Sequence, residues 1–171
     1  MRTFALVASS FALLAAVTAV SAGADTTVAS FTLTAGSLSI SVPAGPVSLG
    51  SQVASTSVTT IAGTLGVVTV SDQRGGVTVW TASAIATSFT PVPTGPANPA
   101  SNASYAAGLV TQSATVTATT YAVASLIGVS TVVSGASTGI STASWNPSIS
   151  VSVPANYAPG VYSSTITHSV A

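Results

Sequence analysis

The sequence contains no cysteine, lysine or glutamate, and only four of its 171 residues carry a formal charge. In ordinary soluble domains roughly a quarter of the residues are charged. Without cysteine no disulfide can form, so the fold must depend on its core and its backbone hydrogen bonds. With two arginines and two aspartates in total, the chain also has few groups for acid–base catalysis.

The scarcity of positive charge excludes nucleic-acid binding. Each phosphate contact needs a lysine or arginine that releases counterions, and the chain has only Arg2 and Arg74. Arg2 lies in a predicted leader, which leaves one arginine. An anionic membrane surface is disfavoured for the same reason.

Residues 1–24 predict a secretory signal peptide. Arg2 supplies the positive start, residues 4–20 are apolar, and small residues at 20–24 offer a cleavage site. A retained membrane anchor is the alternative, but the apolar stretch contains serine and threonine and is shorter than the ~20 residues of a comfortable span. We therefore expect residues 25–171 to be one secreted domain, at the cell wall or cell surface, without a transmembrane segment.

Serine and threonine together account for 55 residues, and 47% of the chain is apolar. In residues 37–42 and 148–153 serine alternates with leucine, isoleucine or valine, which predicts half-buried strands with one hydroxyl face. Residues 64–71 also favour a strand. The turn 72–76 follows, and residues 77–89 are expected to pair with the first strand as its antiparallel partner.

The later part of the chain gives weaker patterns. Four prolines in residues 91–104 predict a long irregular loop, and a short strand is expected at 105–110. The region up to residue 142 favours either two weak strands or a short helix. A turn at 154–160 and a final strand at 161–170 complete the prediction.

These patterns indicate an all-β fold, an antiparallel β-sandwich of the Ig-like kind. No segment has a sustained 3.6-residue period with helix-forming residues. A low-complexity stalk rich in serine and threonine is the competing interpretation. Strict alternation and two tryptophans argue against a stalk.

The sequence offers no convincing catalytic or metal site. Residues 135–139 match the Gly-x-Ser-x-Gly elbow around Ser137, but no helix is expected to follow, and both aspartates precede this serine, contrary to the hydrolase order. His168 is the single histidine, whereas a metal site wants three or four ligands. We therefore predict a non-enzymatic protein with no cofactor and no metal.

Two interpretations fit the turn that contains Asp72, Arg74, Gly75 and Gly76. Asp72 and Arg74 are expected to form a local ion pair, with the carboxylate also accepting backbone N–H bonds. A ligand-contacting Arg74 is the alternative. Gly160 is expected to serve a second turn.

Four aromatic side chains complete the set of candidates. Trp80 and Trp145 are either core residues or exposed rings that stack on a sugar. His168 is expected to be half-buried with one satisfied nitrogen, and a pH-sensing role is the alternative. Tyr162 is expected to lie on the same strand face as His168.

Three runs of residues resemble a known family: 65–75, 80–83 and 158–170. In this order they are similar to the WxL domain of Gram-positive surface proteins, which has an early Trp-x-Leu motif and a distal Tyr-x-x-Thr-Leu-Thr-Trp-x-Leu motif. Tyr162 and two threonines match the second motif. Ala82 replaces leucine in the first motif, and His168 and Val170 replace tryptophan and leucine in the second.

The resemblance implies an exported domain attached non-covalently to the cell wall. Its partners would be peptidoglycan or another wall glycan, beside other surface proteins. Trp80, Arg74, Tyr162 and His168 are the residues we expect to contact such a ligand. The alternative function is a self-assembling coat or pilin-like subunit, because a chain near zero net charge with unprotected sheet edges favours self-association.

Overall fold

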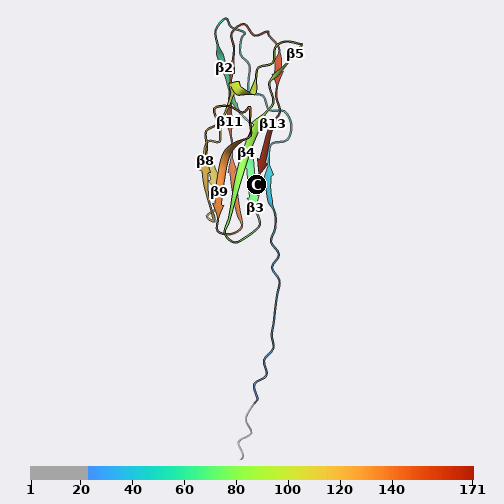
Figure 1. Ribbon diagram of the computed structural model, residues 1–171, viewed down its shortest axis with the longest axis vertical. Coiled ribbons are helices and arrows are strands. Elements are labelled where there is room, and N and C mark those ends of the chain that lie inside the picture. The colour runs from blue at the N-terminus through green and yellow to red at the C-terminus, as the bar shows by residue number, and fades with distance from the viewer. Residues whose placement is uncertain (1–22) are drawn as a thin grey trace, which may run out of the picture. The chain divides into compact units, whose positions relative to one another are not determined.

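The computed structural model describes residues 23–171 (Figure 1), so the predicted signal peptide, residues 1–24, lies almost wholly outside the described part. The chain divides into a unit ending at Leu33 and a unit Thr34–Ala171. Residues 23–33 have no regular secondary structure and are all exposed. Among the described residues no helix is long and apolar enough to cross a membrane.

The unit from Thr34 onward is almost entirely antiparallel β-structure, with one short 3₁₀-helix at Ala100–Asn102. Its strands are β1 (Leu38–Ser41), β2 (Thr59–Thr64), β3 (Val68–Asp72), β4 (Thr78–Ala86), β5 (Thr90–Val92), β6 (Ala103–Ala106), β7 (Val110–Gln112), β8 (Val116–Thr120), β9 (Ser130–Ser137), β10 (Ser141–Trp145), β11 (Ser148–Val153), β12 (Val161–Ser163) and β13 (Ile166–Val170). The predicted all-β sandwich is confirmed.

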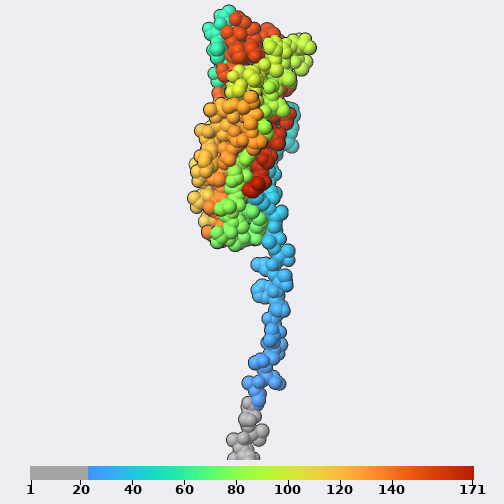
Figure 2. All heavy atoms as spheres, viewed as in Figure 1, coloured from blue at the N-terminus to red at the C-terminus, as the bar shows by residue number. Residues whose placement is uncertain are grey.

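The strands form four ladders that combine into two long layers. In the first layer, the ladder β1-β3-β10-β7 continues into β2-β11-β6, because β2 runs into β3, β6 into β7 and β10 into β11. In the second layer, β13-β4-β9-β8 continues into β12-β5 in the same way. Figure 2 shows β8, β9, β4 and β13 of this second layer side by side.

Each layer bends where one ladder passes into the next. In the first layer Gly66 adopts the left-handed φ of +90° and donates its N–H to Asn146 Oδ1 at 3.1 Å, and Gly108 has a φ of +72°. Such angles strain any residue with a side chain, so glycine stands there. In the second layer Ser164 donates its hydroxyl to the Thr87 carbonyl at 2.6 Å. Polar side chains therefore replace ladder bonds at the bend.

The prediction that the strands around the turn 72–76 pair with each other is wrong. β3 pairs with β1 and β10, whereas β4 pairs with β13 and β9. The turn thus carries the chain from one layer to the other. Val68 and Val70 of β3 and Trp80 and Ala82 of β4 are all buried, which two strands achieve by lying in opposite layers that enclose one core.

The predicted strands at 37–42 and 148–153 are confirmed as β1 and β11, but three other predictions need correction. The loop expected at 91–104 contains part of β5, the 3₁₀-helix and the start of β6. The strand expected at 105–110 is divided by the bend at Gly108 between β6 and β7. The last strand is likewise divided, because β12 pairs with β5 and β13 pairs with β4.

Residues 111–142, for which two weak strands or a short helix were expected, contain no helix. They include β8, β9 and the start of β10, so the two-strand alternative was the better one. Val132 and Val133 of β9 are completely buried.

Two tryptophans dominate the core. Trp80 and Trp145 are each 2% exposed. A Cβ atom at Gly135 would overlap the indole ring of Trp80, and Gly135 of β9 lies opposite Trp80 of β4 in the ladder. The absence of a side chain at Gly135 therefore creates the space that the ring fills.

We predict that Gly135→Ala lowers the free energy of unfolding by about 1–3 kcal/mol, because the added methyl group forces the Trp80 ring out of its packed position. Chemical denaturation followed by tryptophan fluorescence measures the effect. Gly128→Ala is the matched control, since a Cβ there meets no atom within 4 Å. Equal stability of the two variants would contradict this role of Gly135.

Candidate functional site

Trp80 cannot contact a ligand in this fold. Only 2% of the residue is exposed, and its indole nitrogen is buried without a hydrogen-bond partner among the described residues. The expectation that Trp80 stacks on a sugar is therefore corrected: its ring fills the core against Gly135. Trp145 is buried to the same extent.

Asp72 and Arg74 form the expected ion pair. Asp72 is fully buried and accepts hydrogen bonds from Arg74 Nε at 2.9 Å, from Arg74 Nη2 at 3.0 Å and from the Arg74 backbone N–H at 3.1 Å. Thr78 Oγ1 adds a fourth bond at 2.7 Å. The hydrogen bonds from the Arg74 side chain hold the pKa of the Asp72 carboxyl well below its usual range. The guanidinium also donates to the Val79 carbonyl, so the hydrogen bonds of the Arg74 side chain stabilise the turn and the start of β4.

The turn glycines have distinct structural reasons. Gly75 and Gly76 have left-handed φ angles of +71° and +70°, which explains two successive glycines after Arg74. Gly160 has another reason, because a Cβ atom there would lie 3.0 Å from the Val92 carbonyl oxygen. It permits the close approach of the chain before β12 to β5.

His168 belongs to a hydrogen-bonded chain through the core. Trp145 Nε1 donates to the Tyr105 hydroxyl at 2.8 Å, and that hydroxyl lies 3.2 Å from His168 Nε2. An indole N–H can only donate, so the tyrosine oxygen accepts from Trp145 and shares a second hydrogen bond with His168 Nε2. This agrees with the predicted half-buried histidine with one satisfied nitrogen.

Burial sets the acid–base properties of this chain. Desolvation raises the pKa of Tyr105 to about 12 and lowers the pKa of His168. Both shifts favour the neutral forms of the two side chains.

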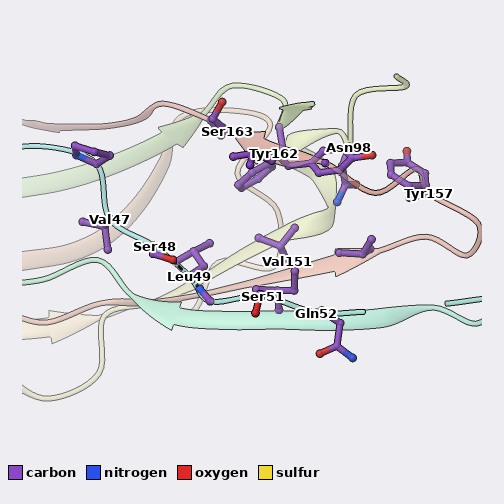
Figure 3. Close-up of a pocket in the computed structure, with 18 of the residues that line it drawn as sticks. Val47, Ser48, Leu49, Ser51, Gln52, Asn98, Val151, Tyr157, Tyr162 and Ser163 are labelled. Carbon is purple, nitrogen blue, oxygen red and sulfur yellow. Dashed lines mark hydrogen bonds between the residues drawn. The ribbon is translucent and has the colours of Figure 1, made fainter. Parts of the chain in front are cut away.

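Tyr162 and His168 both line a pocket of about 960 Å³ beyond the bend. Figure 3 shows Val151 and Tyr162 lining it together with Val47, Ser48 and Leu49 of the irregular segment between β1 and β2. Sequence reasoning missed most of this lining, which includes Leu49, Ile61, Phe89, Val153, Tyr157 and Ile166. No lining residue carries a formal charge, so the pocket suits an uncharged, mainly apolar group.

The two tyrosines of the pocket lie close together. The rings of Tyr157 and Tyr162 are 6.1 Å apart and inclined at 34°. Their hydroxyls donate to the backbone carbonyls of Ala97, at 3.3 Å, and Ala158, at 2.9 Å. The hydroxyl protons are therefore used, and the rings and the acceptor side of each hydroxyl oxygen are available to an occupant.

A second surface consists of hydroxyl side chains on the outer side of the first layer. These residues alternate with buried ones and lie opposite one another across neighbouring strands. One row is Ser39, Ser71 and Thr142, and the next is Ser41, Thr69, Ser144 and Thr111. We call these two rows the hydroxyl face. None of its members carries a charge, and each hydroxyl can both donate and accept a hydrogen bond.

Ser137 is not placed for catalysis. It is 1% exposed, and its hydroxyl lies 2.8 Å from that of Ser141. The next element is the strand β10 and not a helix, as the sequence context indicated. Within residues 23–171 no three histidine, cysteine or acidic side chains gather where they could hold a metal ion.

Comparison of the chain with protein-family models, with curated proteins and with solved structures finds no match. The resemblance to the WxL domain therefore rests on the motif residues alone.

We predict that Tyr105→Phe lowers the free energy of unfolding by about 1–3 kcal/mol, because it leaves Trp145 Nε1 and His168 without their partner in the core. Urea denaturation at pH 7 measures this loss. Tyr121→Phe is the control, since its hydroxyl meets only the Ser134 hydroxyl at an exposed site. A loss no greater than that of the control would show that the core chain contributes little.

We also predict that stability decreases as the pH falls below about 7. The His168 pKa is lowered in the folded protein, so the unfolded chain, with a histidine pKa near 6.5, binds the proton first. The stabilisation is complete above pH ~7 and decreases by at most about 1.4 kcal/mol per pH unit until the folded form is protonated as well. Urea midpoints between pH 8 and 5 should show this slope, and His168→Gln should remove it. A slope that persists in His168→Gln would assign it to another group.

Proposed function

We propose that residues 25–171 form a non-catalytic domain of the cell surface that is held to the cell wall by neutral glycan. The observation that carries this proposal is the hydroxyl face, whose two rows cross three and four strands without a charged side chain. Adjacent strands lie about 4.8 Å apart, so the face presents closely spaced donors and acceptors to the hydroxyls of a sugar polymer.

The lack of charge suits such a ligand. A neutral polysaccharide provides no partner for a buried ion, and an unpaired charge in the contact would be costly to desolvate. One neutral hydrogen bond contributes only about 0.5–1.5 kcal/mol. Retention on a wall therefore requires many such bonds along one polymer, which a regular face provides better than a small pocket.

Two sequence features support the proposed location. Residues 1–24 have the pattern of an export signal, and the residues around Tyr162 resemble a domain associated with wall attachment. Both support a secreted protein that associates with the wall non-covalently. Peptidoglycan and other wall glycans are the ligands we propose.

A self-assembling surface subunit is the second candidate function. It is favoured by Val28, Phe31 and Leu33, which are 92%, 91% and 90% exposed. Large apolar side chains exposed together are typical of interaction sites.

We predict that the double variant Thr69→Val, Ser144→Ala reduces retention on purified cell walls by roughly fivefold or more, because each lost hydrogen bond is worth about 1 kcal/mol. Co-sedimentation of residues 25–171 measures retention, and salt should change it little because no charges are there to be screened. The matched control is Thr131→Val, Ser83→Ala, an equivalent cross-strand pair of the second layer. Unchanged retention of the first variant, or a steep decrease in retention with salt, would contradict the proposal.

A further inference from the structure

Residues 28–35, which we call the arm, have the pattern of a strand without a partner. Those up to Leu33 are exposed and belong to no sheet. From residue 29 onward Phe31 and Leu33 alternate with Ser30, Thr32 and Thr34, so this part of an extended arm has one apolar side and one hydroxyl side. The arm contains no proline, glycine or charge, a composition that favours addition to a sheet edge.

β2 provides an unpaired edge beside the pocket. It pairs with β11 on one side only. Leu65 donates its N–H to the Pro147 carbonyl, so by antiparallel alternation the backbone groups of Thr60, Ala62 and Thr64 point away from β11. Within the described residues these groups have no backbone partner. Ile61 of the same strand lines the pocket.

The segment 42–55 lines this pocket but forms no backbone hydrogen bond with the free edge of β2. Its only backbone hydrogen bond to the rest of the described chain is from the Asn156 N–H to the Ser55 carbonyl, at 2.9 Å. Pro43 and Pro46 lack an N–H, and Gly45 and Gly50 have φ angles of +89° and +102°. Residues 43–50 therefore do not form a regular strand, and the segment is held in place by this one backbone hydrogen bond and by the packing of Leu49 against the core.

Chain length keeps Phe31 away from Ile61 of β2 in its own copy. Gly36 is fixed beside Gln73 at the end of β3 farthest from β2 by a backbone hydrogen bond of 2.9 Å. Five residues from Gly36 back to Phe31 span at most about 18 Å. The strand residues of β3 together with those of β2 back to Ile61 extend roughly 30 Å from that point. A pairing of Phe31 beside Ile61 therefore requires the β2 edge of another copy.

We propose that the arm of one copy adds as a strand to the free edge of β2 in a second copy. Phe31 and Leu33 enter the pocket, and Ser30 and Thr32 face outward. This repeats the pattern of β11, the neighbour of β2, in which Ile149 and Val151 are buried and Ser148 and Ser150 lie on the opposite side. The arm carries no charge and the pocket lining none, so the contact depends on apolar burial and backbone hydrogen bonds.

The contact is of the head-to-tail type. Each copy has one arm and one edge, and these are different surfaces, so repeated contacts produce an open chain of subunits unless the rotation closes a ring. The inference builds on the second candidate function and is independent of glycan binding, because assembly can be measured without wall material.

Two variants of residues 25–171 test the proposal in sedimentation velocity at micromolar to millimolar concentration. The arm variant is Phe31→Ser, Leu33→Ser. The edge variant is Ala62→Pro, which removes an outward N–H and leaves the β11 ladder intact. We expect the unaltered protein to form oligomers that grow with concentration, and each variant alone to stay monomeric. Mixed together they should form a one-to-one dimer and nothing larger, since one intact arm then meets one intact edge.

A monomeric unaltered protein, an arm variant that still assembles, or a mixture without dimers would overturn the proposal. Ser30→Ala, Thr32→Ala is the matched control on the hydroxyl side of the arm and should assemble normally. A peptide of residues 26–35 provides a test that needs no folded variant. In excess it should convert the oligomers of the unaltered protein to monomers, whereas the same peptide with serine at 31 and 33 should have no effect. Equal effects of the two peptides would also overturn it.

Discussion

The hydrogen-bonded chain from Trp145 through Tyr105 to His168 joins the two layers across the core. Trp145 and Tyr105 belong to the first layer, and His168 belongs to the second. The protein has no disulfide, and the described residues contain one ion pair, between neighbours within a single turn. Elsewhere the layers are joined by a few more side-chain hydrogen bonds, such as those of Thr78 with Asp72 and of Ser137 with Ser141, and mainly by apolar packing. This is why the large rings are buried so completely and why Gly135 must lack a side chain.

The bend at Gly66, Gly108 and Ser164 determines where a pocket can open. Below the bend β1 and β13 lie against each other and close one side of the sandwich. Beyond the bend no strand continues β1, because the chain passes into the irregular segment 42–55. The edges of β2 and β12 are then left apart, with Tyr157 and Tyr162 between them. The pocket is thus the direct result of a first layer that is one strand narrower above the bend.

Strict alternation made part of this fold predictable. Residues 37–42 and 148–153 each have apolar residues on one phase only, and both form the expected strands. In residues 77–89 apolar residues occur on both phases, so the sequence could not tell a hairpin from a crossing between layers. Asp72 and Arg74 were predictable because their contact is local. The partners of Trp80 and Tyr162 lie far away along the chain, and segment 42–55 contributes to the pocket without any periodic pattern.

Both ends of the folded unit are tied at the same end of the sandwich. Gly36 and Ser37 bond to Gln73, and Ala171 bonds to Thr81 in both directions, at 2.8 and 3.1 Å. β1 leaves this end as the chain enters the fold, and β13 returns to it. Tension between the two ends would therefore peel β1 and β13 away one hydrogen bond at a time, beginning at the pulled residues, and would not shear whole strands together. A domain built in this way yields easily when pulled by its ends, and it keeps its sheets when the load is spread over a face.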